Sequence, residues 1–244
     1  MLAWYNTLQP EPSRARHLPM SVQQPILHLV LLNLRESPSS PAGEPDETAM
    51  QALLSAFGRL AEIDGVLHLG SVRAASEDST HAIGLFALLH GAKALEEFGT
   101  HPRHIEYLQS AVLPLVSELA TADVVVPNGL PSQGAVWPPS YRAAACFCAG
   151  FQPTTYDWQV RSLFDAAARL PGYATIGGLA VNGRQRFRAA GLALWSGPDD
   201  WSSGGHSDAL RGLWDDCWGS AATDLARVVG PAGAIGQPVP GVVS

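Results

Sequence analysis

The stretch Ile26–Arg35 (ILHLVLLNLR) constrains the fold most, because it is a short run that is apolar on both faces. A proline precedes it and a loop rich in Pro, Ser and Gly follows it, which is typical of a central β-strand. Strand side chains alternate between two faces. One face carries Leu27, Leu29 and Leu31, and the other carries Ile26, His28, Val30 and Leu32. Both faces of the sheet therefore need a covering layer.

The elements after this strand follow an order that predicts a ferredoxin-like unit. Apolar residues at helical spacing predict a helix that begins at Asp46 or Thr48 and ends near Ile63. The further predictions are helices at 91–98 and 103–119 and strands at 66–73, 80–89 and 123–126. Over residues 25–126 the order is β-α-β-β-α-β, the split βαβ arrangement.

The same order recurs in the second half of the chain. Residues 127–140 (PNGLPSQGAVWPPS) are a linker by composition, and residues 141–229 are predicted to form a second, diverged repeat. Its predicted elements are strands at 142–151, 173–182, 187–195 and 222–229 and helices at 156–170 and 208–219. A constant offset of 107 residues (172 − 65) aligns Gly65 with Gly172, Gly70 with Gly177 and Gly84 with Gly191. Residues 1–24 are predicted to be an N-terminal arm and residues 230–244 a flexible tail.

Two such units can cover each other's bare sheet faces within one chain. The predicted fold class is therefore α+β, with two ferredoxin-like repeats packed sheet-to-sheet as an α/β barrel and the helices outside. We expect the interior of this barrel to be an apolar cavity with a few polar groups, which is the usual character of a small-molecule site.

Composition excludes several classes of partner. A net charge of −7 without a basic stripe argues against nucleic-acid binding, and no segment reaches the ~18 apolar residues of a membrane span. The N-terminal region is a poor signal peptide. Cys146, Cys148 and Cys217 have neither a disulfide-like nor a zinc-like spacing and are expected to be small buried residues. We expect a cytoplasmic protein with small-molecule partners; homodimerisation is left open.

The sequence His101-Pro102-Arg103-His104 follows a predicted helix that carries Phe98. Two interpretations are open. The histidines can cap the helix that begins at Pro102, or His104 can work in a pocket. An imidazole with a pKa of about 6.5 can remove an acidic α-proton at neutral pH, and burial lowers the pKa of such a group and keeps it neutral.

These residues together resemble the stress-responsive dimeric α/β barrel (Dabb) family. The resemblance covers residues 25–126 and is carried by the leading strand with its histidine, by GVLHLGSVR and THAIGLF, and by HPRH, which matches the family's His-Pro-x-His signature. The second repeat matches only in its pattern and glycines. The resemblance implies an activity like that of plant polyketide cyclases of the olivetolic acid cyclase type, which need no cofactor.

The resemblance also implies roles for individual residues. His104, the second histidine of the signature, is the implied general base of an intramolecular aldol closure, and His28 and His81 match strand histidines of the same enzymes. The family's pocket tyrosine falls on Phe98, which has no hydroxyl, so Tyr107 is the candidate substitute. We expect His28, His81, Phe98 and Tyr107 to bind the substrate and expect no metal.

Three functions are compatible with these residues. The first is a cofactor-independent cyclase, or a related proton-transfer enzyme, acting on an aromatic or polyketide-like molecule with His104 as base. The second is a cofactor-free monooxygenase, because the same barrel architecture hosts such enzymes. The third is a non-catalytic stress or hydrophobic-ligand-binding protein. Fold alone does not choose among them.

Overall fold

The computed structural model describes residues 24–35, 46–75, 79–126, 143–152, 154–167, 174–181, 186–195, 218 and 222–235. The predicted arm (apart from Gln24), the linker, and the predicted helix at 208–219 (apart from Trp218) lie outside these ranges. None of the described helices is long and apolar enough to cross a membrane.

The first repeat has the predicted order of strands and helices. Its elements are β1 (Ile26–Leu34), α1 (Glu47–Gly58), the 3₁₀ turn η1 (Arg59–Glu62), β2 (Val66–Arg73), β3 (Ile83–Leu89), α2 (Ala92–Thr100), α3 (Pro102–Tyr107), the π-helical turn η2 (Leu108–Val112), α4 (Leu113–Leu115) and β4 (Val116–Val125). Helix α1 begins where the sequence predicts, because the Asp46 carboxylate accepts the Ala49 backbone N–H at 3.1 Å.

The second repeat supplies the other half of the barrel. Its described elements are β5 (Ala143–Gly150), α5 (Asp157–Ala167), β6 (Ala174–Leu179), β7 (Ala189–Trp195) and β8 (Asp224–Ile235). The strand order is β4-β1-β3-β2-β8-β5-β7-β6, so each repeat contributes the ferredoxin-like order of four strands. The chain is therefore an α+β protein of two ferredoxin-like repeats, which confirms the predicted fold class.

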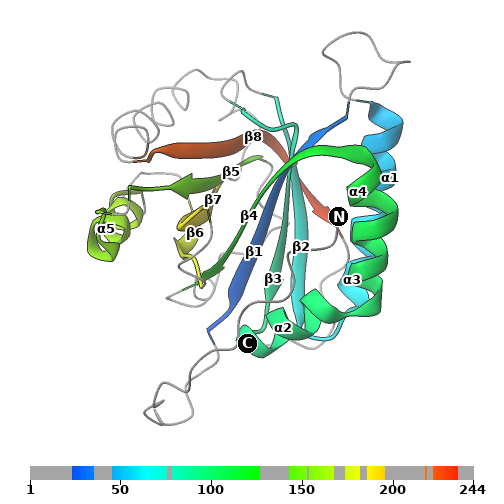
Figure 1. Ribbon diagram of the computed structural model, residues 1–244, viewed down its shortest axis with the longest axis horizontal. Coiled ribbons are helices and arrows are strands. Elements are labelled where there is room, and N and C mark those ends of the chain that lie inside the picture. The colour runs from blue at the N-terminus through cyan, green and yellow to red at the C-terminus, as the bar shows by residue number, and fades with distance from the viewer. Residues whose placement is uncertain are drawn as a thin grey trace.

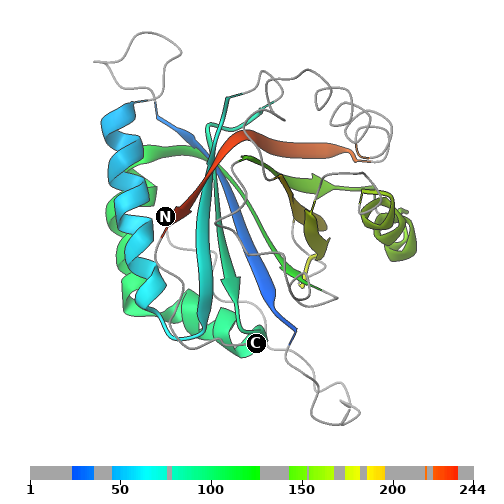
Figure 2. The same ribbon diagram turned by 180° about the vertical axis from the view of Figure 1, so that it is seen from behind.

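Two seams join the repeats into a closed barrel. At one seam β8 pairs with β5 over residues 224–231 and with β2 over residues 232–235, so a single strand belongs to both sheets. The other seam joins the two terminal strands of the order, β4 and the end of β6. It consists of a β-bridge between Val124 and Ala180 and a 2.7 Å hydrogen bond from the Val181 N–H to the Asp123 carbonyl. Figure 1 and Figure 2 show α1 to α4 outside the first sheet and α5 outside the second.

The inner faces of the two sheets form one buried apolar cluster, as the leading strand predicts. Leu27, Leu29 and Leu31 of β1 pack there with Cys146 and Cys148 of β5. Both thiols are free and fully buried, and burial raises their pKa values, so they behave as small apolar groups.

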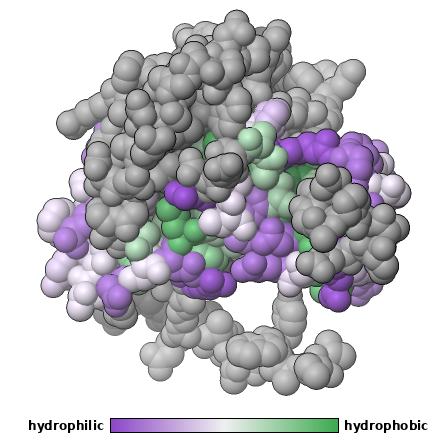
Figure 3. Space-filling model, turned by 90° about the horizontal axis from the view of Figure 1, so that it is seen from above, coloured by the Kyte–Doolittle hydropathy of each residue, from purple (hydrophilic) through white to green (hydrophobic). Residues whose placement is uncertain are grey.

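The outer faces are covered by helices. Leu53 and Phe57 of α1 and Phe98 of α2 pack over the first sheet, and Trp218 packs over the second sheet with its ring centroid 4.6 Å from that of Phe147. Seen from above, patches of apolar side chains on the described surface lie between hydrophilic ones (Figure 3).

Two predicted boundaries are wrong, and each has a physical reason. The helix predicted to end at 119 ends at Leu115, and β4 begins at Val116 rather than at 123; the first half of β4 is mostly exposed, so it lacks the apolar alternation of a strand. Residues 230–235 of the predicted tail belong to β8, which continues to Ile235, and residues 236–244 lie outside the described ranges. Gly230, which resembles a loop residue, allows the backbone to approach the Arg73 carbonyl closely.

The offset of 107 residues is also wrong as a structural alignment. Gly84 faces the interior next to Cys146, but Gly191 pairs with Phe147 of the outer cluster. Likewise, Leu85 is in the outer cluster and Leu192 in the inner one. Because strand side chains alternate, an odd error in the offset places every aligned residue on the opposite face. The two halves therefore share the same strand topology, but the offset of 107 residues does not align their equivalent positions.

His68 is a histidine of the barrel interior. It pairs with Leu88 across β2 and β3, its ring centroid lies 6.0 Å from that of Phe86, and it is 9% exposed. Burial lowers the pKa of His68 to about 4.

We expect His68 to make the fold sensitive to acid. Its folded pKa lies below the unfolded value of 6.5, so its contribution to stability is complete above pH 6.5 and is lost as the pH falls toward 4. The full contribution is roughly 3 kcal/mol. Urea unfolding at pH 7 and pH 4.5 should therefore show a smaller loss of unfolding free energy in His68→Gln than in the unchanged chain. His90→Gln, at an exposed position, is the control; equal losses in all three proteins would contradict the prediction.

Candidate functional site

Strands β1 and β4 place His28 directly opposite Asp123. Their neighbours Leu27, Leu29 and Val124 face the interior, so this pair lies on the outer face of the sheet. His28 Nδ1–H donates to Asp123 Oδ1 at 2.6 Å, and the two side chains are 17% and 16% exposed. The carboxylate can only accept, so it fixes the proton on Nδ1 and orients the ring.

The junction between α2 and α3 brings two more rings to this place. Helix α2 ends at Thr100, and His101 caps α3, because its Nδ1 accepts the Arg103 backbone N–H at 3.2 Å. Pro102 occupies the first turn, where its missing N–H costs nothing. The capping interpretation therefore holds for His101, and the turn that it fixes carries His104.

His28, Asp123, Phe98 and His104 form what we call the histidine cluster. The ring centroids of Phe98 and His104 are 4.6 Å apart, those of His28 and Phe98 are 5.6 Å apart, and those of His28 and His104 are 6.4 Å apart. Phe98 is fully buried, whereas His28 and His104 are partly exposed. Two imidazoles thus share one apolar wall and remain accessible.

The surroundings of His104 favour a neutral imidazole. Burial lowers its pKa, and the nearby His28 lowers it further. Nδ1 lies 3.4 Å from the Gly99 carbonyl oxygen, which can only accept, so the proton belongs on Nδ1 and the lone pair on Nε2. A neutral imidazole with one nitrogen occupied by a backbone carbonyl can act as a base through the other.

His81 does not join the histidine cluster. It precedes β3 and lies near Asn33, whose side chain accepts the Ala82 backbone N–H at 2.9 Å. Asn33 follows His28 by five residues on β1, which is roughly 16 Å at the usual rise of a strand. His81 contacts Thr80 Oγ1 at 2.9 Å, and its backbone N–H donates to the Arg227 carbonyl of β8. Its place in the structure is the β8 seam.

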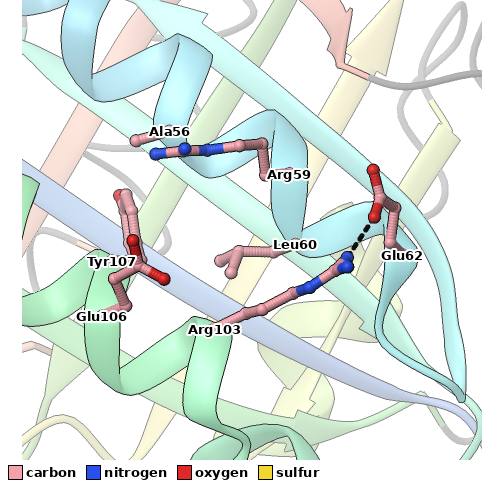
Figure 4. A pocket seen from close by; sticks show the side chains of 7 residues that line it. All are labelled: Ala56, Arg59, Leu60, Glu62, Arg103, Glu106 and Tyr107. Carbon is pink, nitrogen blue, oxygen red and sulfur yellow. Dashed lines mark hydrogen bonds and ion pairs between the residues drawn. The ribbon is translucent and has the colours of Figure 1, made fainter.

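Tyr107 contacts the cluster with its ring and faces elsewhere with its hydroxyl. Its ring centroid lies 6.5 Å from that of His104 and 5.8 Å from that of Phe57. The buried hydroxyl has no hydrogen-bond partner, and the residue lines a pocket between η1 and α3 (Figure 4). Tyr107 therefore does not bring a phenol to the position that Phe98 occupies.

The expected position of the site inside the barrel is corrected by this geometry. The inner faces pack against each other, and the histidine cluster lies outside them, where the ring from β1 meets those from α2 and α3. The reason is alternation along β1: the same pattern that turns three leucines inward turns His28 outward.

Asp123 is the member of the cluster that the sequence analysis missed. The sequence indicates Asp123 only as the start of the predicted strand 123–126. Its pairing with His28 depends on the register of β1 against β4, which joins residues 95 positions apart. Within the described ranges, no three His, Cys, Asp or Glu side chains form a group that could hold a metal ion.

Comparison with known proteins supports the fold and does not identify a function. No protein-family model matches the chain, and no curated protein matches its sequence. A Dabb family protein with a ferredoxin-like fold from Mesorhizobium loti aligns at 22% identity over 42% of this chain and 97% of its own, with a TM-score of 0.36.

Two longer proteins align with both repeats. A putative monooxygenase from Fusobacterium nucleatum covers 88% of this chain and 94% of its own at 10% identity, with a TM-score of 0.53. An anthrone oxidase-like protein covers 91% and 97% at 10% identity, also with a TM-score of 0.53. The tandem barrel is a shared fold. At these identities the likeness concerns the fold alone.

Proposed function

We propose that the protein is a cofactor-independent enzyme in which His104 removes a proton from an activated carbon of a small aromatic or polyketide-like molecule and so starts a ring closure. The observation that carries the proposal is the partly exposed, neutral imidazole of His104 beside a second imidazole that a carboxylate holds in place. The cluster contains no Ser, Thr, Cys or Lys nucleophile.

The first step would be a proton transfer to Nε2 of His104. The carbon between two carbonyl groups of a poly-β-ketone is acidic enough for an imidazole base. Removal of that proton gives an enolate, whose carbon attacks a second carbonyl of the same molecule. The contact from Nδ1 to the Gly99 carbonyl would hold the ring and favour the imidazolium that forms.

His28 and Asp123 would serve the oxygen side of the same step. Asp123 holds Nδ1 of His28, so Nε2 is the nitrogen left for the substrate, where its lone pair can accept a hydrogen bond from an enol hydroxyl. The imidazolium of His104 would return its proton to the alkoxide oxygen that the attack on the second carbonyl leaves. In this arrangement His28 orients an oxygen of the substrate, and Phe98 supports both imidazoles with its apolar ring. We expect neither a metal nor an organic cofactor in this reaction.

A second candidate function is a cofactor-free monooxygenase. Its support is the overall likeness to a putative monooxygenase and to an anthrone oxidase-like protein. The same proton abstraction from an anthrone-like compound gives a carbanion, which can pass electrons directly to dioxygen. Both candidates thus share His104 and differ in the fate of the carbanion. Homodimerisation, and a role without catalysis, stay predictions that the assay below and a measurement of mass in solution address.

The two enzymatic functions are separated by their need for oxygen. The chain is incubated with a linear poly-β-ketone and, separately, with an anthrone, each in air and under argon. We expect cyclised product from the poly-β-ketone at equal rates in both atmospheres. Quinone formation from the anthrone in air alone would assign the monooxygenase function. If neither compound is consumed faster than in buffer, the catalytic proposal is wrong and a binding role remains.

A further inference from the structure

A small pocket lies between the end of α1 and α3, on the side of Tyr107 away from the first sheet. Its volume is about 190 Å³, and it is lined by Ala56, Arg59, Leu60, Glu62, Arg103, Glu106 and Tyr107. Pockets for drug-sized ligands usually span about 300–1,000 Å³. This one therefore suits a much smaller molecule than the substrate proposed for the histidine cluster.

The two walls of the pocket are joined by one ion pair and carry two further charges. Arg103 of α3 pairs with Glu62 of η1. Among the ion pairs of the described residues, none includes Arg59 or Glu106. Figure 4 shows Arg59 extending to the side of the pocket where Tyr107 and Glu106 lie, while Arg103 extends to the other side. One cation and one anion thus line the same end of the pocket.

Tyr107 supplies an independent sign that the pocket holds a ligand. Only 6% of the residue is exposed, and its hydroxyl has no hydrogen-bond partner, although buried hydroxyls almost always have one. Tyr107 extends toward the side of Ala56 and Arg59 (Figure 4). Burial raises its pKa, so the hydroxyl keeps its proton and can donate. The hydroxyl oxygen is itself buried, so a ligand with an acceptor oxygen would satisfy it after the side chains beside it shift.

We propose that this pocket binds a small zwitterion of the amino-acid class. The carboxylate would pair with Arg59, the ammonium group with Glu106, and an oxygen of the ligand would accept from the Tyr107 hydroxyl. A simple anion would bring a negative charge close to the Glu106 carboxylate, and a simple cation would bring a positive charge close to the Arg59 guanidinium. The pair of opposite charges at one end of the pocket therefore favours a ligand that carries both.

The pocket is a different site from the histidine cluster. The ring of Tyr107 lines the pocket and contacts His104 of the cluster, and it lies between the two sites. Occupancy by an amino acid does not depend on proton abstraction by His104, so the two proposals can fail separately. His104→Ala should bind the amino acid as the unchanged chain does.

Calorimetric titration of the full chain tests the inference. The probes are glycine, L-alanine and L-serine, with acetate and methylammonium as single-charge controls. We expect saturable binding of at least one amino acid. Charge-assisted contacts predict that Arg59→Gln and Glu106→Gln each weaken it about tenfold or more. Tyr107→Phe, which keeps the ring, should weaken it several-fold, and Glu96→Gln, at an exposed position of α2, should not.

Two results would overturn the proposal. Acetate binding as tightly as the amino acids, with no effect of Glu106→Gln, would mark a simple anion site. Absence of saturable binding by all three amino acids would show that the pocket takes no such ligand. Circular dichroism of each variant confirms that the substitutions, three of them at the surface and one that keeps a buried ring, leave the fold intact.

Discussion

Replacement of His104 by alanine is expected to lower the rate of ring closure by about a thousandfold, since a positioned general base contributes 10²–10⁴-fold. Substrate affinity should stay within a few-fold, because the variant keeps His28 and Asp123 in place. In the unchanged chain the base must be neutral. Burial and His28 lower the pKa of His104, so the acidic limb of the kcat/KM profile should lie below pH 6.5. Steady-state kinetics between pH 5 and pH 8 measure both effects.

The same motif offers a matched control for this experiment. His101 accepts the Arg103 backbone N–H as the cap of α3, and asparagine is among the best capping residues. His101→Asn should therefore keep the helix start and the activity. Unchanged turnover in His104→Ala, or an equal loss in both variants, would contradict the assignment of His104 as the base.

Substitution of Gly230 by alanine is expected to cost about 3 kcal/mol of unfolding free energy, the upper range for forcing extra volume into a packed site. A Cβ at this position would lie 1.8 Å from the Arg73 carbonyl oxygen and 3.0 Å from the Ala75 nitrogen. Both are backbone atoms, so no side-chain rotation relieves the clash. The position is also where β8 passes from β5 to β2. Denaturant unfolding monitored by circular dichroism measures the loss.

Gly99→Ala is the matched control, with an expected effect of opposite sign. A Cβ at Gly99 meets nothing within 4 Å, and the residue lies within α2. Alanine there should raise the unfolding free energy by about 0.5–1 kcal/mol, because glycine loses more conformational freedom in a helix. If Gly230→Ala were as stable as Gly99→Ala, the proposed close approach at the seam would be wrong.

The parts of the fold that could be predicted are those where one local pattern dominates. The alternation in ILHLVLLNLR correctly separates inner from outer residues, and the predicted strand 66–73 has the observed limits of β2. Segments with competing patterns were not predictable. The start of β4 has exposed residues and helical spacing, and the end of β8 contains Gly and Pro, so tertiary pairing decides both.

The candidate site was predictable only where a motif is continuous in the chain. HPRH marks the turn that places His104, but nothing local indicates that Asp123 lies beside His28, because that contact exists only in the register of β1 against β4. His81 shows the converse. It has the sequence pattern of a second strand histidine, yet its distance from His28 along β1 places it at the β8 seam.

The strand β8, which belongs to both sheets, has a consequence for how the protein can evolve. In a barrel made from two identical chains, every substitution occurs twice and closure depends on protein concentration. Here the two halves are held together at the high effective concentration that covalent linkage provides. Symmetry is no longer required for closure. The second half can therefore keep the apolar face that seals the barrel without the His101-Pro102-Arg103-His104 sequence that the first half carries.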